Sequence, residues 1–280
     1  MDPIDEHSSL FEREGGSGAR YQPTPFARGP WDPDALHGGP VAALFAHAIE
    51  AHEPGDVPPF VARLTVELLR PVPLVPLTVT TATLRPGRKV GWVDAAMTDD
   101  HGRTVAVARA LRTHRLDPAL DVGDAANPPV PRLSPPHAAP PATLGVLNHV
   151  GFWSANEFAL VAGAWDTPGP AGAWLRLRVA LVAGATLSPL ERVCAAADFG
   201  SGLGNPVRMS NSGAINPEIT VHVHRHARGE WIGLESTAWA HGDGAGLCET
   251  RLFDEHGPIG RGTQALLVQE FRPFPEPPGS

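Results

Sequence analysis

The sequence predicts an α+β protein made of two similar halves, in each of which one buried helix precedes a set of antiparallel strands. Three observations lead to this prediction. The chain has 280 residues, which is enough for two domains of ordinary size. It aligns with itself when it is shifted by 155 positions, the separation of Thr65 and Thr220 (220 − 65). Each half carries one helical pattern followed by several strand patterns.

The internal repeat runs without a gap over about fifty residues. Many of the aligned positions that are not identical exchange one residue for a similar one. The matched segments include Thr65-Val66 with Thr220-Val221, Asp99 to Gly102 with Asp254 to Gly257, and Ala110-Leu111 with Ala265-Leu266. Because turn residues fall on turn residues in an unbroken register, we infer a duplication.

Each half contains one stretch in which apolar residues have helical spacing. The first spans 40–52 (PVAALFAHAIEAH) and the second spans 189–199 (PLERVCAAADF). Ser188 is a good N-cap for the second helix, and Glu191 completes a capping box with it. Both stretches are rich in alanine and apolar nearly all round, which predicts two buried helices.

The strand patterns alternate apolar and polar residues and are separated by turn residues. We expect strands at 60–70, 77–84, 92–98 and 104–114 in the first half, and at 218–225, 231–239, 247–253 and 259–268 in the second. The segment from Asp99 to Gly102 is a hairpin signal, with glycine supplying the positive φ. Strands joined by hairpins predict an antiparallel meander in each half.

Composition also predicts the boundaries between the units. The glycines near residue 15 predict a flexible N-terminus over 1–18, and the segment PFPEPPGS predicts a flexible tail over 272–280. Proline is dense over 117–142, which predicts a linker. The two halves are then 19–116 and 143–271.

The charge balance argues against a nucleic-acid partner. The chain has 22 basic and 30 acidic residues, a net charge of −8, whereas nucleic-acid binding needs a basic face. Cys194 and Cys248 are too few for a disulfide framework and predict free thiols. The first residues lack the features of a signal peptide, and no apolar run has the length of a membrane span. We therefore expect a cytoplasmic protein without a membrane span.

No cofactor or metal is predicted. The glycines at 200, 202 and 204 follow a helix and not a strand, so they do not fit a dinucleotide-binding loop. His222, His224 and His226 alternate and would share one face of a strand, but no cysteine or carboxylate stands at a diagnostic spacing. The Gly-x-Ser-x-Gly motif of serine hydrolases does not occur.

The sharpest local motif is His37-Gly38-Gly39-Pro40, directly before the first helix. Two glycines let another molecule approach the backbone, and the free amides at a helix N-terminus carry partial positive charge. Such amides can bind a carbonyl oxygen as it becomes an oxyanion. An ordinary glycine turn with proline in the first helical turn would leave the same pattern.

The second half contributes three polar candidates. Asp198 ends the alanine-rich helix, where a buried carboxylate needs a partner or a shifted pKa, although an exposed helix end is an alternative. Gln264 lies within an apolar strand, where it could also face solvent, and Asn216 precedes a strand in a common Asn-Pro turn. At the offset of 155, Gln264 corresponds to Arg109.

Taken together, these motifs resemble those of the TesB-like acyl-CoA thioesterases. Arg28 to Trp31 and the His37-Gly38-Gly39-Pro40 motif resemble the N-terminal half of that family. Asp198, Asn216, His224-Arg225 and Gly262-Thr263-Gln264 resemble the C-terminal half. The resemblance spans about 21–269. It implies a double hotdog, two repeats that each wrap a long helix in a curved antiparallel sheet.

The resemblance also implies hydrolysis of an acyl-CoA thioester by water, without a covalent intermediate, in lipid metabolism. It implies a catalytic set of Asp198, Asn216 and Gln264, although the family usually has Thr or Ser where Asn216 stands, and Ser212 is an alternative. His37, Gly38 and Gly39 would bind the substrate carbonyl. Because each half holds only part of the set, we expect one composite site per chain.

Three questions stay open at this point. A non-catalytic acyl-binding protein, or a hotdog enoyl-CoA hydratase or dehydratase, would share the fold; the latter enzymes usually pair an Asp with a His a few residues away. An anionic CoA ester would need a local basic pocket in a chain of this net charge. Edge strands could pair with a second copy, so a homo-oligomer is a further expectation.

Overall fold

The computed structural model describes most of the chain. The described residues are 4, 8–15, 19–53, 58–116, 119–122, 133–138, 141–142, 150–165, 167–208 and 212–270. The tail over 272–280 and most of the linker over 117–142 therefore lie outside them. None of the described helices combines the length and the apolar character needed to cross a bilayer.

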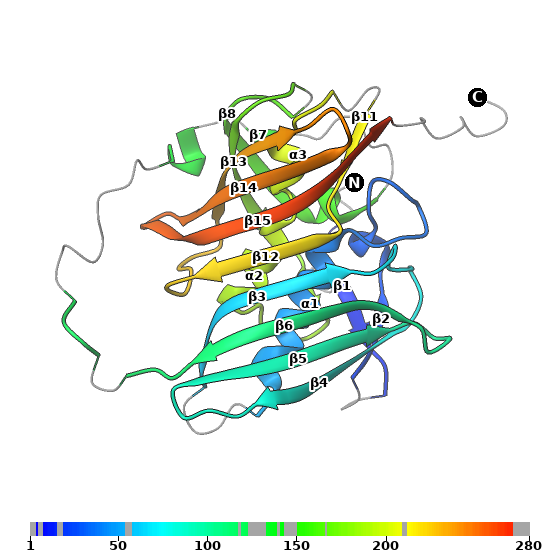
Figure 1. The fold of residues 1–280 in the computed structure, drawn as a ribbon, viewed down its shortest axis with the longest axis vertical. Coiled ribbons are helices and arrows are strands. Elements are labelled where there is room, and N and C mark those ends of the chain that lie inside the picture. The colour runs from blue at the N-terminus through cyan, green and yellow to red at the C-terminus, as the bar shows by residue number, and fades with distance from the viewer. Residues whose placement is uncertain are drawn as a thin grey trace.

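The strands of both halves form one continuous sheet, with helices packed behind it (Figure 1). In the first half the elements are α1 (Gly38–Ala51), β3 (Phe60–Leu68), β4 (Leu77–Arg85), β5 (Val90–Thr98) and β6 (Thr104–Thr113). In the second half they are α2 (Pro189–Ala197), α3 (Gly200–Leu203), β11 (Ser212–Ile215), β12 (Glu218–Val223), β13 (Ile232–Ala240), β14 (Ala245–Asp254) and β15 (Gly257–Glu270). Apart from α3 and β11, which were not predicted, these elements match the predicted strands and helices within a few residues at each end.

The order of the strands differs from a simple meander. β4, β5 and β6 follow one another as expected, but β3 pairs with β6 and not with its neighbour in sequence, β4. Likewise β12 pairs with β15. The connection over 69–76 contains prolines and is too long for a tight hairpin, so it crosses to the far edge of the three-stranded unit.

The two halves meet where β3 and β12 lie side by side (Figure 1). The pair is antiparallel, and Thr65 lies directly opposite Thr220, with their hydroxyl oxygens 3.2 Å apart. These two residues are equivalent in the sequence repeat. Equivalent residues can face each other only at a two-fold axis, so the duplicated halves are related by a pseudo-two-fold axis through this contact.

The last strand of each half departs from the ungapped alignment by one residue. Arg109 lies opposite Thr65, whereas Thr263 lies opposite Thr220. The structural offset of β6 and β15 is therefore 154 (263 − 109). A shift of one residue along a strand exchanges its two faces.

This shift corrects the expected partner of Gln264. Its structural equivalent is Ala110, and not Arg109. Ala110 and Gln264 are both buried. The hairpins explain the difference, because Asp254 pairs directly with Gly257 while the first turn carries one residue more before its strand resumes.

The helices occupy the interior as predicted, but they differ in length. α1 has 14 residues, most of them buried, whereas α2 has nine and is followed by the four-residue α3. A long helix in each half is therefore seen only in the first half. The two helices approach closely, because a Cβ built on Gly39 would lie 2.6 Å from the carbonyl oxygen of Ala195.

Residues 8–15 of the N-terminal segment are part of the fold, although composition predicts a flexible N-terminus over 1–18. β1 (Ser9–Arg13) pairs with β2 (Arg20–Pro23) and, in parallel, with β10 (Ala180–Val182) of the second half. Leu10 and Phe11 are fully buried. Burial of these two apolar residues stabilises the strand. Composition did not indicate this, because polar residues and glycines make up most of the segment.

Several further strands of the second half were not predicted. They are β7 (Pro141–Ala142), β8 (Asn156–Ala162) and β9 (Ala171–Leu177), and they extend the sheet beyond β13. The short helical turns η1 (Pro25–Ala27), η3 (Pro136–Ala138) and η4 (Phe152–Ala155) complete the elements. The end of the expected linker belongs to this half, because the Trp174 indole donates to the carbonyl of Ser134, 2.5 Å away.

Candidate active site

The N-terminus of α1 is one side of the candidate site. His37 is the N-cap, and its Nδ1 lies 3.2 Å from the Gly39 amide nitrogen. Gly38 and Gly39 form the first turn, where helix amides have no partner within the helix. Gly38 makes no hydrogen bond through its amide within the described part of the chain. That amide is therefore the donor available to a substrate.

The C-terminus of α2 is the other side. Asp198 is the C-cap of this helix and is 4 % exposed. Its Oδ2 lies 2.5 Å from His37 Nδ1, so the two halves meet at an acid–histidine contact. Asp198 thus has a histidine partner that its own sequence neighbourhood does not show. The Asp198 carboxylate also packs closely against the glycine turn. A Cβ built on Gly38 would lie 2.8 Å from each carboxylate oxygen of Asp198.

Two amide side chains complete the surroundings of this carboxylate. Asn216, between β11 and β12, donates from Nδ2 to Asp198 Oδ1 at 2.6 Å. Gln264, on β15, places Nε2 at 3.4 Å from Asp198 Oδ1 and from its main-chain oxygen. The Oε1 atom of Gln264 is buried and has no hydrogen-bond partner among the described residues. An unused buried acceptor so close to a carboxylate is costly unless a ligand or water uses it.

The structure therefore brings together all six predicted site residues: His37, Gly38, Gly39, Asp198, Asn216 and Gln264. The alternative to Asn216, Ser212, has a side chain outside the described residues. The three alternating histidines do not share a strand face, because β12 ends at Val223, before His224 and His226. In the described ranges no group of three or more His, Cys, Asp or Glu is arranged to hold a metal ion.

The electrostatics of the site keep Asp198 ionised. Burial by itself would raise the pKa of this carboxyl group, because it disfavours the charged form. The positive charge and hydrogen bond of His37, the Asn216 amide and the Gly39 N–H oppose that effect. Together they hold the pKa of Asp198 below its ordinary value. A carboxylate that is ionised at neutral pH can accept a proton.

Two aromatic residues that sequence reasoning missed hold the His37 ring. The Phe152 and Phe199 rings lie 5.0 and 4.8 Å from the imidazole, and they stack on each other at 5.1 Å. Phe199 directly follows Asp198 in sequence, which is the one local signal that could have revealed it. Phe152 comes from η4, a segment without a regular pattern. The rings fix the imidazole orientation and keep water from its faces.

Comparison with known families gives the geometry its context. Sequence models of the acyl-CoA thioesterase N-terminal and C-terminal domains match residues 27–113 and 123–268. The chain belongs to the acyl-CoA thioesterase family. No match was found among curated protein sequences.

Solved structures show the fold that this thioesterase shares. A protein proposed to be a thioesterase II, from Thermobifida fusca YX, is 22% identical with a TM-score of 0.70, over 92% of this chain and 95% of that one. A conserved protein with a hot dog fold from Alicyclobacillus acidocaldarius is 16% identical with a TM-score of 0.68, over 96% and 98%. The acyl-CoA thioesterase II TesB2 from Mycobacterium marinum is 15% identical with a TM-score of 0.61, over 93% and 96%. The thioesterase therefore has a hotdog fold.

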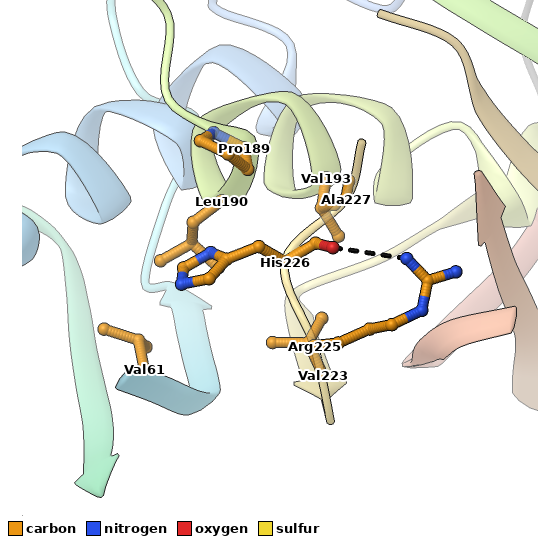
Figure 2. A pocket seen from close by; sticks show the side chains of 8 residues that line it. All are labelled: Val61, Pro189, Leu190, Val193, Val223, Arg225, His226 and Ala227. Atoms are coloured by element: carbon orange, nitrogen blue, oxygen red, sulfur yellow. Dashed lines mark hydrogen bonds between the residues drawn. The ribbon is translucent and has the colours of Figure 1, made fainter. Parts of the chain in front are cut away.

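The pseudo-two-fold axis generates a second location in the thioesterase that is equivalent to the site, at the N-terminus of α2 (Figure 2). Ser188 caps α2 as His37 caps α1, an offset of 151 (188 − 37). Pro189 and Leu190 then stand where the glycines would be, and Val61 stands at the place of Asn216 (216 − 155). Proline has no N–H, and the valine side chain cannot hydrogen-bond.

The cavity at this second location is small and mostly apolar. Its volume is about 10 Å³, roughly the space of one water molecule. Figure 2 shows the apolar side chains of Val61, Leu190, Val193 and Val223 around it, with His226 and Arg225 alongside. At the place of Asp198 this half has His47 (198 − 151), which pairs with Glu191 at 2.8 Å. The polar set of the candidate site occurs once in the described chain.

Proposed function

We propose that this thioesterase hydrolyses acyl-CoA at one composite site between its two halves, by direct attack of water. The observation that carries the proposal is the contact of ionised Asp198, from the second half, with the His37-Gly38-Gly39 turn of the first. The two halves, 19–116 and 143–271 joined by 117–142, would form a double hotdog, to which β1 is added. Because its substrates are acyl-CoA esters, the proposal includes a cytoplasmic role in lipid metabolism.

The first role is activation of the thioester carbonyl. The Gly38 N–H points from the positive end of α1 and has no partner among the described residues, so it can donate to the carbonyl oxygen as negative charge develops there. The Gly39 N–H lies against His37 Nδ1 and Asp198, so its role is to hold the carboxylate. The two glycines therefore have different roles, whereas the sequence assigned both of them to the substrate carbonyl.

The second role is activation of water. Asp198 would take a proton from a water molecule as its oxygen attacks the carbonyl carbon. The free Oε1 of Gln264 can accept the other hydrogen of that water, which fixes its direction. Asn216 donates to Asp198 and so positions the base. When the C–S bond breaks, the proton held by Asp198 passes to the sulfur, which gives the free acid and the CoA thiol.

The buried cysteines do not supply a covalent route. Burial raises the pKa of the Cys194 thiol far above its ordinary value and that of Cys248 to about 11. Only the thiolate is a strong nucleophile, so both groups are inert near neutral pH. This supports attack by water without an acyl-cysteine intermediate.

The test is the release of CoA thiol from short, long and aromatic acyl-CoA esters by wild-type protein and by Asp198→Asn. Loss of a general base costs about 10² to 10⁴ in rate, so we expect kcat to fall by at least about a hundredfold. The control is Asp94→Asn, which removes a half-buried carboxylate paired with Arg109. Following enoyl absorbance on unsaturated esters separates hydration from hydrolysis. Full activity of Asp198→Asn would exclude the proposed base.

A further inference from the structure

A second, larger cavity lies at the other end of α1, away from the thioester centre. Its volume is about 230 Å³. It is formed where α1 ends, where the hairpin between β4 and β5 turns and where β6 ends, so three elements of the first half build it. The residues that line it are Glu53, Pro59, Thr83, Arg85, Pro86, Gly87, Arg88, Gly91, Trp92, Val93, Arg112, Thr113 and His114.

This cavity is strongly basic in an acidic protein. It gathers three arginines, Arg85, Arg88 and Arg112, against the single carboxylate of Glu53, although the whole chain carries a net charge of −8. Arg88 forms no ion pair with a carboxylate of the described residues. Such a concentration of guanidinium groups creates a local positive potential that attracts an anion.

The walls of the cavity are held in place. Arg112 donates to the main-chain oxygens of His52 and Glu53, at 2.8 and 3.0 Å, where α1 ends. Glu53 has a φ of +41°, a conformation that non-glycine residues rarely adopt, and Thr83 fixes its carboxylate at 2.7 Å. Strained backbone held by neighbouring side chains is common at binding sites.

An aromatic platform lies beside the charges. The guanidinium carbon of Arg85 stands 5.1 Å from the centre of the Trp92 ring. A stacked Arg–Trp pair offers a flat surface to another ring, while free guanidinium N–H groups can bind phosphate oxygens. The cavity therefore combines the two elements that recognise a nucleotide: stacking for the base and bidentate donors for the phosphates.

The second half does not repeat this arrangement. Strand pairing gives the equivalent residues. Leu247 takes the place of Trp92, and its partner Trp239 takes that of Arg85. Asp243 stands at the place of Arg88 and Leu266 at that of Arg112, at offsets of 155 and 154. The duplication alone would have given both halves the same hairpin. The three arginines and the stacked Arg–Trp pair are thus a property of one half, and packing of the shared fold does not require them.

We propose that this cavity is a binding site for a nucleotide phosphate. The geometry separates it from the thioester centre by the length of α1, about 21 Å for 14 residues at 1.5 Å each. The nucleotide can be the phosphorylated adenosine of CoA itself, a source that rests on the proposed function. It can also be a free adenine nucleotide that binds independently. Both present a purine ring with phosphate groups to the same arginines.

The first experiment measures binding by calorimetry, with adenosine 3′,5′-bisphosphate and ADP as the probes. Wild-type protein should bind at least one of them saturably, and Arg88→Ala should bind at least tenfold more weakly. The control is Arg261→Ala, which removes an exposed arginine of the second half that pairs with Glu249. Absence of saturable binding to wild type, or equal binding by Arg88→Ala, would overturn the proposal. Asp198→Asn should bind normally, so this result is independent of hydrolysis.

The second experiment distinguishes the two sources. If the site takes the head of CoA, Arg88→Ala should raise KM for acyl-CoA at least severalfold, leave kcat unchanged and leave hydrolysis of acyl-pantetheine, which lacks the nucleotide, unaffected. If it takes a free nucleotide, KM for acyl-CoA should stay the same while ADP binding is lost. A fall of kcat on both esters, with unchanged thermal unfolding, would show that Arg88 serves the thioester centre and would contradict a separate nucleotide site at this cavity.

Discussion

The contact between His37 and Asp198 is the feature on which the candidate site depends at the scale of single residues. It joins the N-cap of one helix to the C-cap of another, and it is one cause of the lowered pKa of Asp198. Since the histidine lowers the pKa of the acid, it extends the range of pH in which the base is ready to accept a proton. In the proposed mechanism, the base of the second half therefore depends on a residue of the first.

Replacing His37 with Gln should move the acid limb of the pH–rate profile. The lowered pKa of Asp198 keeps it ionised. Losing the histidine leaves only the Asn216 amide and the Gly39 N–H to oppose the effect of burial, so the pKa of Asp198 should rise. The limb of kcat/KM that reports the base should then shift to higher pH. His47→Gln, on the same helix but paired with Glu191, is the matched control. An unchanged profile in His37→Gln would contradict the assigned pairing.

The two glycines should respond differently to substitution by alanine. In Gly38→Ala the new Cβ would lie 2.8 Å from both Asp198 oxygens, so it should displace the carboxylate and lower kcat with little loss of stability. In Gly39→Ala it would lie 2.6 Å from the Ala195 oxygen and 2.7 Å from Phe152 Cε1. That overpacking should cost about 1–3 kcal/mol. Thermal unfolding and CoA release measured on both variants test the distinction.

At the scale of elements, the interface of α1 and α2 buries a second polar group. Ser188 Oγ, at the N-cap of α2, donates to Glu50 of α1 at 2.5 Å. Burial raises the pKa of Glu50, nearby Glu191 adds to the rise, and the serine hydrogen bond opposes it. The folded protein therefore binds a proton on Glu50 more tightly than the unfolded chain does.

Glu50→Gln should remove a pH dependence of stability. Since the folded pKa of Glu50 is raised, its contribution to stability falls as the pH rises from the ordinary glutamate value of 4.5 through the folded value. The variant should gain stability relative to wild type across that interval. Denaturant unfolding of both proteins at several pH values measures the difference, and Glu235→Gln, a half-buried residue paired with Arg251, is the control. Equal pH dependence in wild type and Glu50→Gln would refute this.

Local patterns in the sequence predicted where most helices and strands lie along the chain, but not which strands pair in the sheet. Alternation located the strands from β3 to β6 and from β12 to β15, because burial of one sheet face imposes it. The pairing of β3 with β6 is a long-range contact that no local pattern encodes. The strand β1 was missed because its burial rests on Leu10 and Phe11 alone.

The sequence predicted the residues of the candidate site better than the contacts between them. The glycine turn and the acid at a helix end have local signals, and the family resemblance selected Asn216 and Gln264. The pairing of His37 with Asp198, and the two phenylalanines around it, depend on how the halves are placed across the axis. The one-residue difference between the hairpins could not be predicted either. The glycines of the two turns align in the sequence repeat, so the alignment gave no sign that β15 is shifted by one residue relative to β6.

At the scale of the whole molecule, the halves are held together by contacts that do not need the linker. β3 pairs with β12, β1 pairs with β10, and α1 packs against α2. Each half keeps its own helix and strands, but neither half contains both His37 and Asp198. The proposed active site therefore needs both halves.

Cleavage between the halves should leave the enzyme assembled and active. A protease site inserted within 123–130 would cut the expected linker, and the shared sheet should keep the fragments together. We expect the two fragments to elute as one species in gel filtration, with CoA release within about twofold of the uncut protein. The reason is that the strand pairs and the helix contact between the halves stay formed after the cut. Separation of the fragments, or loss of turnover on cutting, would show that the linker is required.

The meeting of Thr65 and Thr220 at the axis has a consequence for how such a protein can change. In a dimer of identical chains, one codon change at that position would alter both sides of the contact at once. Here each threonine has its own codon, so one can vary while the other stays. The same independence lets the α1 turn keep its glycines while the α2 turn holds Pro189 and Leu190. Because both halves lie in one chain, each half can change its sequence without an identical change in the other.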